Sequence, residues 1–144
     1  MALADFEPTK VVIEHNGKPL VSVRGLCLDD ISILVRAHLI VLNKLVEQAK
    51  SNVQGGVFGV NDLFMLELMG KAPDVAWDII ALAADEPEYG DTARKMPASL
   101  QIKILSEVMR LTMEDIGGPK ALVALVAGMV NQNQPLAGVL ATTR

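Results

Sequence analysis

Histidine, cysteine and aromatic residues are scarce in this chain of 144 residues. It has two histidines and one cysteine, and aromatic residues make up only 3% of it. A single cysteine cannot form an intrachain disulfide, and three Cys and His residues are too few for a zinc site of that type. Hydrophobic residues nevertheless make up 51%, so we expect an aliphatic core and no metal site.

The chain also lacks clustered positive charge and a long apolar run. Its formal net charge is −4, and its only adjacent basic pair is Arg94 and Lys95. Nucleic-acid binding needs clustered Lys and Arg, so no nucleic-acid partner is expected. The longest apolar run, residues 121–130, is far shorter than the roughly 20 residues of a membrane span. The first ten residues contain no apolar signal segment, which predicts a soluble cytoplasmic protein.

Motifs of catalysis and cofactor binding are missing as well. Residues 55–59 are rich in glycine but lack a phosphate-loop lysine and a dinucleotide fingerprint, so they are predicted to form a flexible connector. Residues 85–91 are acidic but lack the alternating spacing of a calcium loop, which predicts a solvated acidic loop. We therefore expect no catalytic residues, no cofactor and no enzymatic activity.

His38 and Cys27 are the remaining side chains with reactive chemistry. The simplest interpretation is structural, with His38 buried or at an interface and its ring nitrogen hydrogen-bonded, and with Cys27 acting as a small apolar residue. A nucleophilic cysteine needs a base within hydrogen-bond reach, and His38 is the one candidate base. The alternative hypothesis is therefore a small helical enzyme or ligand-binding domain with a pocket beside these two residues.

An Asn16-Gly17 dipeptide between two short apolar segments predicts a β-hairpin over residues 10–24. The first strand covers residues 10–14 and the return strand covers residues 19–24. Asn-Gly favours a tight hairpin because both central residues of a type I′ turn need a positive φ. Two strands alone are marginally stable in water, so the hairpin must pack on helices, join a third strand or pair with another chain.

A long helix is predicted over residues 29–50. Asp29 and Asp30 precede its apolar run and are expected to cap it, since carboxylates accept the free N–H groups of a first helical turn and suit the positive end of the helix dipole. At 100° per residue, Leu39 and Ile40 fall on or beside the polar side, so the apolar arc is wider than that of an ordinary surface helix. Such a helix is either central in the domain, the simpler interpretation, or also contacts a partner.

Apolar residues at helical spacing predict further helices over residues 61–69, 74–84, 96–113 and 119–130. Pro73 and Pro119 suit first helical turns. The expected fold class is mainly α (α+β), with an N-terminal β-hairpin followed by a bundle of about five helices. A single domain is expected over residues 1–131, followed by a loosely ordered C-terminal tail over residues 132–144.

The last predicted helix carries no charge over residues 121–130. A helix that is apolar all round must be buried, either in its own core or against another subunit. Together with the extra apolar residues of the long helix, it forms the predicted partner-binding surface. The residues expected to make these contacts are Leu39, Ile40, Leu122, Leu125, Val126 and Met129.

The segment that joins hairpin and helix carries a motif, V-R-G-L-x-L-D-D-I over residues 23–31, followed by residues 34–36 and His38. It resembles the tail assembly chaperones of long-tailed bacteriophages and prophages, also called pre-tape-measure proteins. The motif is not catalytic, so the resemblance transfers no active-site residue.

The resemblance implies a function in the host bacterial cytoplasm. Such chaperones bind the long helical tape measure protein, help to recruit tail tube subunits and leave before the virion is finished, and a frameshifted longer form is common. A homo-oligomer is expected. The alternative within this class is another structural or joining protein of the phage tail module.

Overall fold

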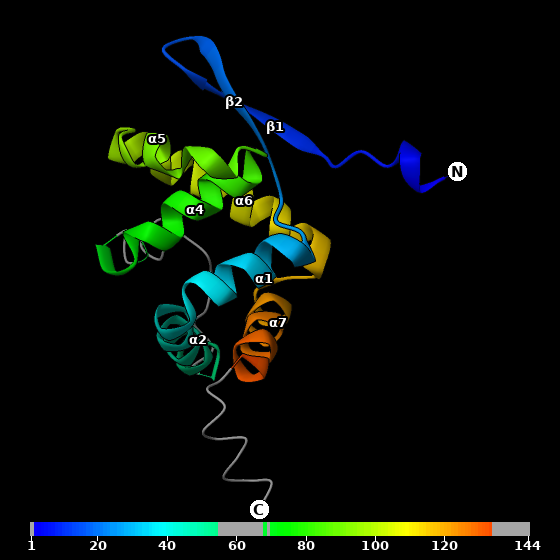
Figure 1. Cartoon of the computed structure of the whole chain (residues 1–144), viewed down its shortest axis with the longest axis vertical. Helices are drawn as coiled ribbons and strands as arrows, with labels where there is room; N and C mark the ends of the chain where they lie inside the picture. Colours follow the sequence, from blue (N-terminus) through cyan, green and yellow to red (C-terminus); the bar gives the residue numbers. More distant parts are fainter. Residues whose placement is uncertain (1, 55–67, 69, 134–144) are drawn as a thin grey trace, which may run out of the picture.

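The computed structural model describes residues 2–54, 68 and 70–133, and it is mainly helical with one two-stranded sheet (Figure 1). The predicted fold class is confirmed. The predicted connector at 55–59, nearly all of the helix at 61–69 and the tail from residue 134 lie outside the described residues. The elements, in chain order, are η1 (Leu3–Asp5), β1 (Lys10–His15), β2 (Lys18–Arg24), α1 (Leu28–Ala37), α2 (Leu39–Gln54), α4 (Pro73–Ala83), η2 (Pro87–Tyr89), α5 (Gly90–Arg94), α6 (Ala98–Ile116) and α7 (Pro119–Gln132).

The predicted hairpin is confirmed and projects from the helical body (Figure 1). Asn16 and Gly17 have φ values of 55° and 75°, as a type I′ turn requires. The strands pair antiparallel with one register shift, which leaves Leu20 without a partner on β1. Ile13 and Val23 are buried, and both strands contact α6, while β2 also contacts α4. The hairpin thus gains its stability by packing on the helices.

The prediction of one continuous helix over residues 29–50 is wrong, because the helix breaks at His38. This residue ends α1 with φ −132° and ψ 40°, and α2 begins at Leu39. The imidazole Nε2 of His38 lies 2.6 Å from Oδ2 of Asp78 in α4. The helix breaks without a proline or glycine, at a residue whose side chain bonds to α4. Leu39 and Ile40 lie in the first turn of a new helix. The polar and apolar sides assigned to one continuous helix therefore do not hold for these two residues.

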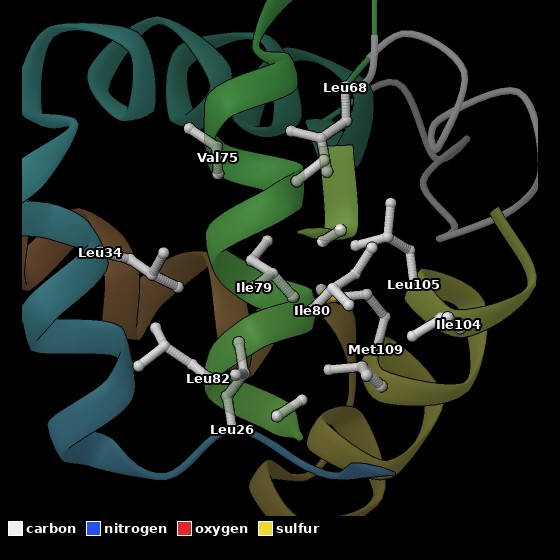
Figure 2. Close-up of a cluster of buried hydrophobic side chains, with 14 of the residues drawn as sticks. Leu26, Leu34, Leu68, Val75, Ile79, Ile80, Leu82, Ile104, Leu105 and Met109 are labelled. Atoms are coloured by element: carbon white, nitrogen blue, oxygen red, sulfur yellow. The ribbon is translucent and has the colours of Figure 1, made fainter. Parts of the chain in front are cut away.

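The centre of the domain is α4, and not the helix that follows the hairpin. Figure 2 shows its side chains between Leu34 of α1 on one side and Ile104, Leu105 and Met109 of α6 on the other. The expectation that the first long helix is central is therefore wrong. Seven of the eleven residues of α4 are buried: Val75, Ala76, Ile79, Ile80, Ala81, Leu82 and Ala83.

The last two described helices follow the predicted pattern with shifted ends, because α6 begins two residues later than predicted and both helices end later. One face of α6 is buried, with Ile104, Leu105 and Val108 fully inaccessible to solvent. The helix continues to Ile116, where Gly117 adopts φ 107° and its N–H donates to the carbonyl of Met113. Pro119 then starts α7 at its first position. After this turn α7 packs beside α2, and the candidate site lies on these two helices.

Candidate functional site

Arg24, at the end of the hairpin, joins three parts of the fold. Its guanidinium donates to Oδ2 of Asp30 in α1 at 2.6 Å, to Oδ1 of Asp85 at 2.8 Å and to the carbonyl of Leu82 in α4 at 3.1 Å. The Arg24 and Asp30 side chains are only 13% and 7% exposed, whereas that of Asp85 is 52% exposed. The carbonyl of Leu82 lies in the last turn of α4 and also accepts the backbone N–H of Asp85 at 3.0 Å. The Arg24 cluster therefore locks the hairpin to α1 and α4.

The next two residues hold the same segment against α6. A Cβ on Gly25 would lie 3.0 Å from the backbone C of Leu111 and the backbone N of Thr112. The N–H of Leu26 donates to Oγ1 of Thr112 at 2.8 Å, and that hydroxyl donates onward to the carbonyl of Val108. The absence of a side chain at position 25 thus allows two backbones to touch.

Asp29 and Asp30 occupy different environments in the first turn of α1. The helix begins at Leu28, one residue earlier than predicted, with Cys27 at its N-cap. Oδ2 of Asp30 accepts the backbone N–H of Cys27 at 2.9 Å, while Asp29 is exposed. The Asp30 carboxylate therefore accepts hydrogen bonds both from Arg24 and from the backbone just before the helix.

The stability of the fold should depend on the ionisation of Asp30. Burial alone would raise its pKa, but hydrogen bonds from Arg24 and Cys27 bring the pKa below the ordinary 3.8. A carboxyl whose pKa is lower in the folded state contributes its full stabilisation above its unfolded pKa and loses it as the pH falls through the folded one. As the pH is lowered below about 4, the free energy of unfolding should therefore decrease less in Asp30→Asn than in the unchanged chain. Urea unfolding at several pH values measures this, and parallel pH profiles would contradict it.

The structure does not bring His38 and Cys27 together. They lie at opposite ends of α1, about 16 Å apart at 1.5 Å per residue. His38 is half-buried with its ring nitrogen bonded to Asp78, as predicted, whereas Cys27 is exposed. The hypothesis of a shared pocket beside these residues therefore loses its geometric basis. Among the described residues there is also no group of three or more potential metal ligands.

The predicted partner-binding residues lie on two helices that pack against each other, α2 and α7 (Figure 1). Ile40 is 74% exposed. Leu39, Leu122, Leu125, Val126 and Met129 are only partly buried and rest on the edge of the core. In α7 only Val130 is fully buried. The α2–α7 surface is thus an apolar helix pair that the described part of the chain covers incompletely.

An apolar cavity of about 120 Å³ lies beneath this surface. Leu122 and Val126 line it, together with residues that the sequence assigns only to the core, such as Leu42 and Leu45. Their helical spacing is the signal for a shared face, but spacing does not reveal a void. The remaining lining residues are Leu26, Ile31, Leu34, Val35, Val46, Leu68, Val75, Ile79, Met109 and Val123. Such a lining offers hydrophobic contact and no polar group for chemistry.

No helix within residues 2–54 and 70–133 is long and apolar enough to cross a membrane. The chain matches no curated protein and no solved structure. A family model described as pre-tape measure protein matches residues 1–143, which confirms the resemblance carried by the motif. The motif residues are those that lock hairpin, α1, α4 and α6 together, and the match extends over the α2–α7 surface. The chain therefore belongs to the pre-tape measure protein family.

Proposed function

We propose that this chain is a phage tail assembly chaperone that binds the tape measure protein along the α2–α7 surface. Membership of the family gives it a role in phage tail assembly. The observation that carries the proposal is the uncharged stretch of α7, whose apolar side chains remain partly exposed beside those of α2. A surface of this kind suits the apolar stripe of a long helical client.

The chemistry of α7 favours close contact with another helix. Ala124 and Gly128 are exposed and stand one helical turn apart, and a Cβ on Gly128 would meet no atom within 4 Å. Small residues on an open face let a second backbone approach closely. The apolar cavity below leaves room for the neighbouring side chains to repack when a client docks.

The family resemblance supports further parts of this proposal. The chaperone helps to recruit tail tube subunits, self-associates, acts in the host bacterial cytoplasm and leaves before the virion is complete. Its role is to keep the tape measure protein soluble until the tube forms around it, a task that needs binding surface and no catalysis.

Ile40→Asp should weaken client binding about tenfold, because the client would cover an apolar side chain that becomes charged. The stability of the free chain should change little, since Ile40 is 74% exposed. The test is co-expression with the tape measure protein of the same phage, with co-purification and client solubility as the measurements.

Phe6→Asp is the matched control, because Phe6 is 72% exposed and directly follows η1. Figure 1 shows this N-terminal segment away from α2 and α7. The variant should leave client binding unchanged. Equal effects of the two variants would place the binding surface elsewhere, and a client that stays insoluble with the unchanged chain would refute the function itself.

One observation favours a second candidate, a structural or joining protein of the tail module. The hairpin projects from the body with its outer edges unpaired among the described residues, as in subunits that join by sheet extension. A joining protein stays in the finished tail, whereas a chaperone leaves it. Mass spectrometry of purified tails therefore separates the two candidates.

A further inference from the structure

The outer edge of β1 is a sheet edge without a partner. The only sheet among the described residues has two strands, so β1 pairs with β2 on one side only. Unpaired edges are templates for pairing with another strand. The side chains of β1 alternate, with Lys10, Val12 and Glu14 exposed and Ile13 buried. A strand added at this edge would therefore extend the outer face of the hairpin without disturbing its buried face.

The backbone groups of the same three residues point outward in the plane of the sheet. The type I′ turn pairs the carbonyl of His15 with the N–H of Lys18, so His15 faces β2. Facing alternates along an antiparallel strand, which turns Lys10, Val12 and Glu14 toward the open edge. In agreement, the carbonyl of Glu14 accepts the Lys103 ammonium at 3.5 Å, a long, exposed bond that a backbone N–H can replace.

We propose that β1 pairs antiparallel with β1 of a second copy of this chain, with Val12 on the two-fold axis. In this register Lys10 faces Glu14 of the second copy, and Glu14 faces its Lys10. Neither charge has an ion-pair partner among the described residues. Opposite charges directly across an antiparallel pair are stabilising, and Val12 meets its own copy between them.

Neighbouring registers fit less well. A shift of two residues in one direction would bring Pro8, which has no N–H, opposite Glu14 and remove both charge pairs. A shift in the other direction would place the turn residue Asn16 opposite Lys10. The register centred on Val12 is thus the one that uses the length of β1 and pairs both charges.

This contact specifies the self-association included in the proposed function, on which it rests. A two-fold pairing of identical edges closes at two copies and builds a four-stranded sheet. It lies on the hairpin, away from α2 and α7 (Figure 1). Client binding and pairing are therefore separable, and failure of one does not imply failure of the other.

The test is a charge exchange in the full chain, followed by sedimentation velocity. Lys10→Glu and Glu14→Lys should each weaken the dimer about tenfold, because each turns two attractive pairs into repulsive ones. The double variant should restore the dimer, and an equimolar mixture of the two single variants should form mixed dimers. Lys18→Glu, the same charge change at the other end of the turn, should have little effect.

Circular dichroism of each variant checks that the fold is intact, and client co-purification checks the proposed function separately. The pairing is overturned if the unchanged chain stays monomeric up to about 100 µM, or if the exchanges leave its assembly unaltered. Failure of the double variant to restore the dimer would overturn the register.

Discussion

Arg24→Met is expected to lower the free energy of unfolding by about 3–5 kcal/mol, because it leaves the buried Asp30 carboxylate without its partner. The Asp30 side chain is 7% exposed and receives its shortest bond, 2.6 Å, from Arg24. The substitution also removes one donor to the carbonyl of Leu82 at the end of α4, which keeps the backbone N–H of Asp85. Denaturant unfolding monitored by circular dichroism measures the loss.

Arg110→Met is the control, since Arg110 forms two ion pairs along the exposed side of α6 with Glu107 and Glu114. Surface pairs contribute little, so this variant should unfold almost like the unchanged chain. The double variant Arg24→Met with Asp30→Asn should lose less than the sum of its single changes, because it leaves no buried charge without a partner. If Arg24→Met costs no more than Arg110→Met, the cluster does not hold the hairpin in place.

Gly25→Ala should cost about 1–3 kcal/mol, toward the upper end of the range for overpacking, because the added methyl meets backbone atoms that cannot rotate away. The added Cβ would lie 3.0 Å from main-chain atoms of Leu111 and Thr112. Separation of the two segments would also stretch the bond between Leu26 and Thr112. Thermal and denaturant unfolding should both report the loss.

The same substitution at Gly128 should have the opposite sign. This glycine lies in α7, is exposed and has open space where a Cβ would be, so alanine should stabilise the chain by about 0.5–1 kcal/mol. A stabilising Gly25→Ala would show that the approach of the motif segment to α6 is looser than the structure places it.

Local chemistry accounts for the parts of the fold that the sequence predicts. Asn16 and Gly17 define the hairpin because few other residues accept two consecutive positive φ values. Pro73 and Pro119 start α4 and α7 because a proline costs nothing where the first N–H groups have no helical partner. These signals are contained in neighbouring residues, so no knowledge of the tertiary structure is needed.

The parts that the sequence does not predict depend on contacts between distant residues. The break at His38 follows no local signal and coincides with a bond to Asp78, 40 residues later. The Arg24 cluster joins residues separated by 6 and by 61 positions, so no periodic pattern reveals it. The Asp pair is recognisable as a helix start, but the ion pair of Asp30 is not.

The candidate site was predictable to the same extent. The uncharged run of α7 predicts a helix that must be buried against other residues, and this follows from composition alone. Which of its faces stays open depends on how α2 packs beside it, and that depends on the break at His38. Ile40, 74% exposed, lies in the first turn of the helix that this break creates.

The bond between Leu26 and Thr112 spans 86 residues, and this has a consequence for the chain as it leaves the ribosome. At about 5–20 residues per second, Thr112 is synthesised roughly 4–17 s after Leu26. During that interval the hairpin and α1 can form locally, but the α6 surface on which the hairpin docks does not yet exist. The segment that carries the family motif is therefore made well before the helix that fixes it in place. A nascent chain stalled before Thr112 would expose the buried faces of Ile13 and Val23 to other proteins in the cell.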